Sequence, residues 1–203
     1  MTSKIELVLF DIGGVLGSNG WDREQRAAAI EKFGLDAEDF QYRHEETVAA
    51  LEVGMMTLDE YLTITAYCGD RTVSCAALKS FVFSQSEPWP DSIAVARDVA
   101  STGARMATLN NESEELNNHR IRLFGLREIF PCFFSSCWLR VRKPMHEIYD
   151  IVLGITQVDP TRTLFVDDRL QNLAPAAALG MHTIHFRSAA QLRQDLQAHG
   201  VLP

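Results

Sequence analysis

Short apolar runs recur along the second half of the chain, each followed by a stretch with helical spacing. We expect strands over residues 104–109, 130–135, 163–166 and 182–186, and helices over residues 91–102, 112–124, 145–153, 170–179 and 188–199. An apolar run at residues 5–10 predicts one further strand near the start. Strands that alternate with such helices indicate right-handed βαβ units and a parallel sheet covered on both faces. The pattern therefore predicts a doubly wound, Rossmann-like α/β fold.

The alternation is interrupted after the first strand. Helical spacing continues there over residues 22–33, 36–52, 58–67 and 73–84, without a convincing strand between them, and Pro88-Trp89-Pro90 closes the segment. We therefore expect two parts: an α/β core made of residues 1–16 and 91–203, and an inserted four-helix unit of residues 17–90. The insertion point predicts that the four helices cover the carboxyl edge of the sheet as a cap.

Composition narrows the class of protein. With 203 residues, 46% hydrophobic and 23% charged, the chain is an ordinary globular protein large enough for one sizeable core. A net charge of −8 argues against nucleic-acid binding, which requires a basic face. No apolar run approaches the ~20 residues that span a membrane, and no signal-peptide pattern is present. The cysteines (Cys68, Cys75, Cys132 and Cys137) form no metal-binding or Cys-x-x-Cys pattern, so we expect unpaired thiols in a cytoplasmic protein. We expect the protein to be a monomer or a homodimer.

Carboxylates stand at the ends of two of the predicted strands. Asp11 follows the first apolar run, and Asp167 and Asp168 end the run that starts at residue 163. Ligands of open parallel sheets bind beyond the carboxyl ends of the strands, so adjacent strands would bring the three carboxylates together. Such a cluster requires a divalent cation, and oxygen ligands suit Mg²⁺. Lys143, just before a predicted helix, adds the positive charge that a phosphoryl group needs.

These residues form an ordered set of motifs. Residues 10–16, Phe-Asp-Ile-Gly-Gly-Val-Leu, resemble the first motif of the haloacid dehalogenase-like hydrolases, and Asn110-Asn111, Lys143 and Asp167-Asp168 resemble the second, third and fourth motifs. The four occur in the family's order at the expected strand ends, and the resemblance covers nearly the whole chain. The helical insertion is similar to the type-1 cap of that family.

The resemblance implies an active site built on Asp11. Asp11 would be a covalent nucleophile that attacks phosphorus and forms an aspartyl phosphate. Mg²⁺ would be held by the Asp11 side chain, the Gly13 carbonyl and Asp168, and Asp167 would either bind it through a water molecule or support the other ligands without binding it. The expected substrate is a small phosphorylated metabolite, and the expected activity is phosphate-monoester hydrolysis.

Further residues would bind the phosphoryl group. Lys143 would neutralise Asp11 and a phosphoryl oxygen. Asn110 takes the place of the hydroxyl residue that is usual in the second motif, and its amide offers the same donor. Asn111 stands beside it. Glycines at positions 13 and 14 allow backbone N–H groups to approach the phosphoryl oxygens.

One departure from the family pattern concerns catalysis. Phosphatases of this family normally carry a second Asp two residues after the nucleophile as general acid and base, and here that residue is Gly13. Loss of such a group typically costs about 10²–10⁴ in rate. Two alternatives therefore remain open. One is a catalytically impaired protein that binds a phosphate ligand or a partner; the other is a hydrolase of carbon–halogen or carbon–phosphorus bonds.

Substrate selection is expected from the insertion. Trp21 is placed to line the pocket, and Arg43 and His44 on the second helix offer polar groups to it, with Arg71 as a further candidate. The alternatives are that Trp21 packs against a helix start and that Arg43 and His44 lie on a solvated helix face. Arg23 and Arg26 are expected to be ordinary surface charges.

Overall fold

A parallel sheet of five strands organises the molecule. The computed structural model describes residues 4–67 and 73–203, so Cys68 and the candidate Arg71 lie outside the described residues. The strands run in the order β3-β2-β1-β4-β5, all parallel. Their bounds are β1 (Leu7–Phe10), β2 (Arg105–Asn110), β3 (Phe133–Ser135), β4 (Thr163–Asp167) and β5 (His182–His185). Because β1 pairs with both β2 and β4, the chain changes direction across the sheet beside β1.

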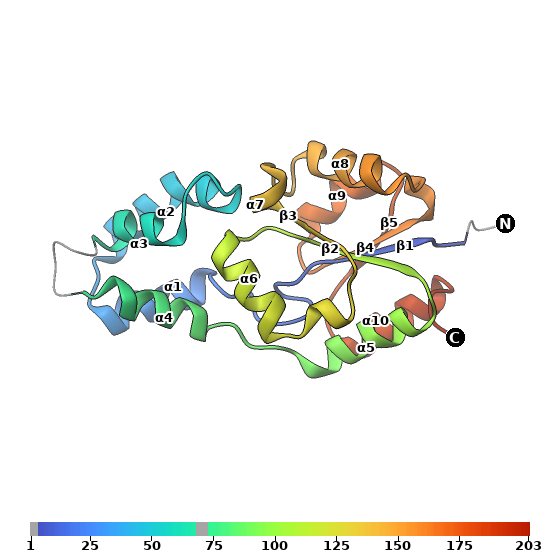
Figure 1. The fold of residues 1–203 in the computed structure, drawn as a ribbon, viewed down its shortest axis with the longest axis horizontal. Coiled ribbons are helices and arrows are strands. Elements are labelled where there is room, and N and C mark those ends of the chain that lie inside the picture. Colours follow the sequence, from blue (N-terminus) through green and yellow to red (C-terminus); the bar gives the residue numbers. More distant parts are fainter. Residues whose placement is uncertain (1–3, 68–72) are drawn as a thin grey trace.

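Helices cover both faces of the sheet, as predicted (Figure 1). Alternate residues of β1 point to opposite faces: Val8 and Phe10 pack with α5 (Pro90–Ser101) and α10 (Ala189–Ala198). Leu7 and Leu9 pack with α8 (His146–Thr156) and α9 (Leu170–Ala178). Such two-sided burial explains why the strands are apolar runs rather than alternating ones. The remaining core elements are α6 (Glu114–Leu123), α7 (Ser136–Leu139), η1 (Leu126–Glu128) and η2 (Pro160–Arg162).

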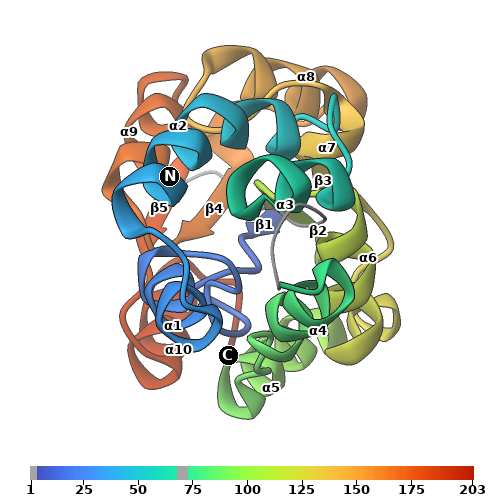
Figure 2. The same ribbon diagram turned by 90° about the vertical axis from the view of Figure 1, so that its left-hand side faces the viewer.

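Four helices follow β1 and lie together at one end of the molecule, away from both termini (Figures 1 and 2). They are α1 (Arg23–Phe33), α2 (Ala37–Glu52), α3 (Leu58–Ala66) and α4 (Cys75–Ser84). Each begins with a side-chain cap, from Asp22, Asp36, Thr57 and Ser74. They share a hydrophobic cluster around Phe40, Tyr61 and Val82 that Leu116 of α6 also joins. We call α1–α4 the helical insertion.

The element bounds differ from the prediction in a few places. The sequence placed the end of α8 at Gly154, but the helix continues to Thr156, and Gln157 adopts the left-handed conformation (φ 55°) that ends it. An exposed glycine inside a helix costs only about 1 kcal/mol relative to alanine, so Gly154 is not sufficient to stop it. The strand expected over residues 130–135 is shorter, because a turn of 3₁₀ helix precedes it.

Two compositional expectations can be compared with the fold. The described cysteines are free thiols: Cys75, Cys132 and Cys137. Within residues 4–67 and 73–203, no helix has the length and apolarity needed to cross a membrane. The cytoplasmic location and the oligomeric state stay predictions.

Candidate active site

The sheet brings the predicted carboxylates together at its carboxyl edge. Phe10 of β1 pairs with Val166 of β4, and the Asp11 N–H donates to the Val166 carbonyl at 2.9 Å, so Asp11 lies beside Asp167. Asp168 follows directly. Carboxylate oxygens of all three lie within 4.8 Å of one another. This is the convergence that the two apolar runs predicted, at the position beside β1 where the chain changes direction across the sheet.

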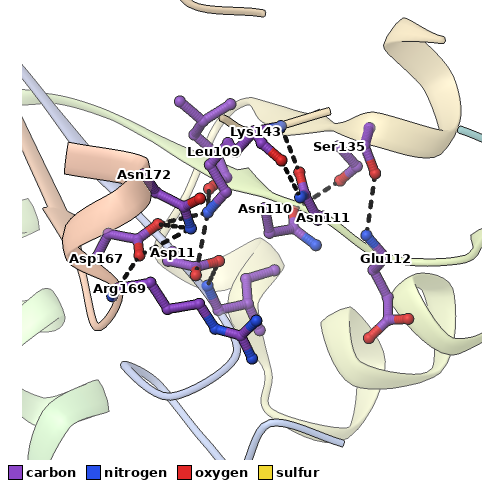
Figure 3. Close-up of polar contacts among 12 residues, drawn as sticks. Asp11, Leu109, Asn110, Asn111, Glu112, Ser135, Lys143, Asp167, Arg169 and Asn172 are labelled. Carbon is purple, nitrogen blue, oxygen red and sulfur yellow. Dashed lines mark hydrogen bonds and ion pairs between the residues drawn. The ribbon is translucent and has the colours of Figure 1, made fainter. Parts of the chain in front are cut away.

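Lys143 joins this cluster from the loop before α8 (Figure 3). Its Nζ lies 2.6 Å from Asp167 Oδ2 and 3.1 Å from Asp11 Oδ2, and it donates to the Leu109 carbonyl at 2.9 Å. Burial disfavours the Lys143 charge, but Asp11 and Asp167 outweigh burial and hold the pKa of Lys143 above its ordinary value. A charged ammonium group therefore lies 3.1 Å from the expected nucleophile.

Asp11 is the most strongly perturbed carboxyl of the cluster. Burial raises the pKa of Asp11 to about 7; Lys143 lowers it, while Asp167 and Asp168 raise it. Burial likewise raises the pKa of Asp168, with Asp167 contributing. Carboxylates that crowd one another in this way are stabilised by a cation.

The three carboxylates fit a divalent cation, but they differ in how many of their oxygens are free to bind it. Asp167 already accepts from Lys143, from the Arg169 N–H at 2.8 Å and from Asn172 Nδ2 at 3.0 Å. By contrast, Asp168 Oδ1 is buried without a partner among the described residues. A Cβ on Gly14, whose φ is +71°, would lie 2.3 Å from Asp168 Oδ2, so a side chain there would displace that carboxylate. Asp11 and Asp168 are thus the available ligands, and Asp167 orients Lys143.

The glycines of the first motif differ from expectation in one respect. The N–H of Gly14 already donates to the Gly17 carbonyl at 2.8 Å, so phosphoryl binding by Gly14 stays a prediction. The role of Gly14 is to leave room for Asp168. The Gly13 N–H makes no hydrogen bond to any described residue and remains a candidate donor.

The two asparagines of the second motif are tied to other parts of the core. Asn110 donates to Asn117 Oδ1 at 3.0 Å and accepts from Ser135 Oγ at 2.9 Å. Asn111 donates to the Lys143 carbonyl at 2.8 Å and accepts from the Lys143 N–H at 2.9 Å, which fixes the backbone that carries the lysine. Each amide nitrogen retains a second hydrogen, so donation to a phosphoryl oxygen stays a prediction.

A buried ion pair lies where the family's second Asp would stand. A Cβ on Gly13 would lie 3.4 Å from Arg120 Nη1, and that same nitrogen lies 3.3 Å from Glu112 Oε2. Arg120 also donates to the Ser18 carbonyl. Burial raises the pKa of Glu112 to about 7 although Arg120 lowers it. The sequence pattern did not predict this pair. Its signal was a charged residue on the same helical face as Leu116 and Phe124.

A cavity of about 310 Å³ lies between the sheet edge and the helical insertion. Asp11, Gly13, Asn111 and Lys143 line it on the core side. Trp21 and His44 line it from the insertion, where the sequence placed them. Arg169, whose guanidinium forms an ion pair with Asp22 at 2.6 Å, is a lining residue that the sequence analysis did not identify.

The structure does not place Arg43 where the sequence predicted it. Arg43 does not line this cavity; it forms a bidentate ion pair with Asp39, donates to the Ile64 carbonyl and stacks over the Tyr67 ring. One residue along α2 turns the side chain by about 100°, which separates Arg43 from His44. Arg26 requires the opposite correction. Expected at the surface, it is only 6% exposed and lines the cavity.

Comparisons with known proteins show which family this chain resembles. Residues 5–180 match the haloacid dehalogenase-like hydrolase family. The chain is 25% identical over 222 residues to D-ribitol-5-phosphate phosphatase of Bacteroides thetaiotaomicron, a match that covers 95% of this chain and 97% of that protein. It is also 25% identical over 206 residues to bifunctional epoxide hydrolase 2 of Rattus norvegicus, covering 94% of this chain and 36% of that protein. The chain spans about a third of the length of the first curated relatives.

Solved structures share the fold. A HAD family enzyme from Bacteroides thetaiotaomicron, in complex with magnesium and inorganic phosphate, superimposes with a TM-score of 0.77 at 21% identity, over 90% of this chain and 94% of that one. L-2-haloacid dehalogenase from Xanthobacter autotrophicus, with chloropropionic acid covalently bound, gives a TM-score of 0.64 at 19% identity, over 98% and 85% of the two chains. The family match extends over most of the sequence and includes every motif at the sheet edge. This chain therefore belongs to the haloacid dehalogenase-like hydrolase family.

Proposed function

We propose that this hydrolase is a Mg²⁺-dependent phosphatase of a small phosphorylated metabolite and that Asp11 is its nucleophile. One observation carries the proposal: three carboxylates lie within 4.8 Å of one another around a buried lysine at the carboxyl edge of the sheet. A metal-bound phosphoryl group is the ligand that this combination of charges suits. Magnesium and phosphate in a neighbouring structure, and phosphatases among the relatives, support the same class.

The proposed chemistry has two displacements at phosphorus. An Asp11 oxygen attacks the phosphoryl group, the bond between phosphorus and the ester oxygen breaks, and the leaving alkoxide takes a proton from water. Water then attacks the phosphorus of the aspartyl phosphate, which releases inorganic phosphate and restores the carboxylate. Mg²⁺, held by Asp11, Asp168 and the Gly13 carbonyl, would cancel the repulsion between the carboxylate and the phosphoryl oxygens.

The chain's own residues supply positioning and charge. Lys143, 3.1 Å from Asp11, neutralises the nucleophile before attack and the phosphoryl oxygens during it. Asn111 fixes the Lys143 backbone, and Asp167 fixes its ammonium group. The proposed phosphate contacts are the Gly13 N–H and the second hydrogens of the Asn110 and Asn111 amides.

Proton transfer to the leaving group is the weak point of this site. Gly13 provides no acid, and the space beside it is occupied by the guanidinium of Arg120. We therefore expect faster turnover for esters whose alcohol leaves easily than for simple alkyl phosphates.

The helical insertion would act as the cap, with residues 17–90 as its extent. Ion pairs cross between the two parts: Arg142 with Glu52 at 2.5 Å and Arg169 with Asp22 at 2.6 Å. With these pairs formed, the cavity has the volume of a small-molecule site. A metabolite is therefore a better fit than a phosphoprotein.

The test is phosphate release from a panel of phosphate monoesters, with and without Mg²⁺. We expect metal-dependent turnover that Asp11→Asn reduces by at least about 10³-fold, because the amide is not a nucleophile. Asp150→Asn, on the exposed face of α8, is the matched control and should retain activity.

Other outcomes would favour the alternatives. Mg²⁺ binding by a folded protein without turnover of any ester would support a binding protein, for which Gly13 is the motivating observation. Release of halide from 2-haloacids without a metal requirement would support carbon–halogen hydrolysis. Either result would contradict the phosphatase proposal.

A further inference from the structure

We propose that the cavity binds a second anionic group of the substrate at Arg26, so that the preferred substrates are phosphate monoesters carrying a carboxylate or another phosphate at their far end. The inference rests on the proposed phosphatase function and goes beyond it by naming the substrate class. It is carried by the environment of one buried guanidinium on the insertion side of the cavity.

Arg26 differs from the other cations that line the cavity. The other four cationic side chains that line the cavity each have a carboxylate partner within ion-pair distance. The pairs are Lys143 with Asp11 at 3.1 Å, Arg120 with Glu112 at 3.3 Å, Arg142 with Glu52 at 2.5 Å, and Arg169 with Asp22 at 2.6 Å. Arg26 forms no ion pair with any described residue. It donates from Nη1 to the Trp21 carbonyl at 3.0 Å, and its Nε is buried without a partner.

An unpaired buried guanidinium is costly, since an arginine side chain cannot lose its proton in a protein. Only 6% of Arg26 is exposed, so solvent compensates for little of its charge, and the carboxylates of Asp22 and Glu52 act on it only from beyond ion-pair distance. The cavity beside it is the space from which compensation can come. A ligand anion there would gain a charge-assisted hydrogen bond and relieve the unpaired charge at once.

His44 provides a second donor at the same end of the cavity. The Trp21 indole N–H donates to the Tyr61 hydroxyl at 3.0 Å, so the Tyr61 proton is free to donate to His44 Nδ1, 2.7 Å away. In a neutral imidazole the hydrogen then sits on Nε2. That Nε2–H makes no hydrogen bond to the described residues, and His44 lines the cavity. Burial, with Arg26 contributing, lowers the pKa of His44 to about 4, which keeps the ring neutral.

The two ends of the cavity therefore carry different requirements. The core side, around Asp11 and Lys143, is arranged for the phosphoryl group that reacts. The insertion side offers the Arg26 guanidinium and a neutral donor at His44. Val48 and Leu51 also line the cavity, as does Glu52, whose carboxylate is paired with Arg142. A substrate whose only anionic group is the reacting phosphate would leave Arg26 unpaired. A substrate with anionic groups at both ends would bind to the core-side phosphoryl site and to Arg26 at once.

The experiment compares esters that differ only at the far end. Two pairs separate the sources of the second anion: 3-phosphoglycerate against glycerol 3-phosphate for a carboxylate, and fructose 1,6-bisphosphate against fructose 1-phosphate for a phosphate. In at least one pair we expect the ester with an anionic group at both ends to have a kcat/KM about 10- to 100-fold higher than its counterpart. This is the effect of one or two charge-assisted hydrogen bonds.

Arg26→Gln tests the residue, and Arg23→Gln, an exposed arginine on the same helix, is the matched control. Arg26→Gln should reduce the preference to within about threefold of unity, Arg26→Lys should restore part of it, and Arg23→Gln should leave it unchanged. Arg26→Gln should also unfold at the same or a higher temperature than the wild type, because it removes an unpaired buried charge. A preference that survives Arg26→Gln, or a wild type without any preference, would overturn the inference while leaving the phosphatase proposal intact.

A binding measurement keeps the inference testable when turnover fails. In the Asp11→Asn protein with Mg²⁺, 3-phosphoglycerate or fructose 1,6-bisphosphate should bind at least about tenfold more tightly than its one-anion counterpart. Adding Arg26→Gln should remove that difference. Equal affinities for both members of both pairs would contradict the second anion site, whether or not the wild type releases phosphate.

Discussion

The two sides of the cavity are built in different ways. On the core side, Asp11, Asp167 and Lys143 stand at or beside strand ends, and Lys143 contacts both carboxylates at nitrogen–oxygen distances of 2.6–3.1 Å. On the insertion side, helices supply the lining residues, and Arg26 is buried without a carboxylate partner. The sheet edge therefore fixes the positions of the reacting groups, whereas the helical side has an unpaired guanidinium that an anionic ligand can pair with. Substitutions on the core side should therefore change mainly the rate of the reaction, and substitutions on the insertion side should change mainly the preference among substrates.

Removing the core-side charge should have the largest effect. Lys143→Met takes away the cation that contacts both Asp11 and Asp167, so we expect kcat/KM for phosphate esters to fall by at least about 10³-fold. The two buried carboxylates would lose their partner, and breaking such a pair typically costs about 3–5 kcal/mol of unfolding free energy. Steady-state kinetics and urea denaturation measure both. A loss of less than about tenfold would show that Lys143 is not part of the phosphoryl site.

Restoring an acid at position 13 should have a smaller, conditional effect. An Asp at this position would place its Cβ 3.3 Å from Asn19 Oδ1 and 3.4 Å from Arg120 Nη1. The guanidinium would hold the pKa of the new carboxyl low, so Gly13→Asp alone should raise kcat/KM for alkyl phosphates less than about threefold. In an Arg120→Gln background the same change should give about tenfold or more.

The leaving group provides the control for this comparison. An aryl phosphate such as 4-nitrophenyl phosphate leaves without protonation, so its turnover should not respond to Gly13→Asp in either background. An equal rise for alkyl and aryl esters would indicate a change in binding rather than an added acid.

The same contrast explains what the sequence could predict. Asp11 and Asp167 were found because a strand fixes where its last residue lies, and an apolar run ending in a carboxylate is visible in a single sequence. Arg26 was assigned to the surface because the three alanines that follow it give α1 no strong apolar stripe to define its buried face. The link between Asn111 and Lys143 joins residues 32 positions apart, and no local pattern encodes it.

Helix facing was the other limit. His44 and Arg43 are neighbours with similar sequence surroundings, yet one lines the cavity and the other forms an ion pair with Asp39 outside it. The apolar positions that decide the orientation of α2, Phe40 and Leu51, become informative only when the insertion's own core is known. The catalytic side of the site therefore follows from strand ends, whereas the selective side depends on how the helices pack.

A pH effect on stability should come from the insertion side. Burial and Arg26 lower the pKa of His44 from 6.5 to about 4, so the unfolded chain binds a proton that the folded chain refuses in this range. The unfolding free energy should therefore fall as pH decreases from about 6.5 to 4, with His44 contributing roughly 2–3 kcal/mol. His44→Asn should show a shallower decline than the wild type, and His146→Asn, an exposed control, should match the wild type. Identical slopes for all three would contradict the assignment.

The smallest effect is expected where the two sides meet. Glu52 of α2 and Arg142 of the core form an ion pair at 2.5 Å, but their side chains are 25% and 35% exposed, so water and salt weaken it. Glu52→Gln should change the unfolding free energy by less than about 0.5 kcal/mol while raising KM about two- to fivefold, since it loosens the insertion over the cavity. Asp98→Asn breaks a more exposed ion pair, with Arg193, between two core helices and should leave KM unchanged. Raising the salt concentration should shrink the difference between wild type and Glu52→Gln. If both variants raised KM alike, the effect would come from net charge, and the pair would not hold the two sides together.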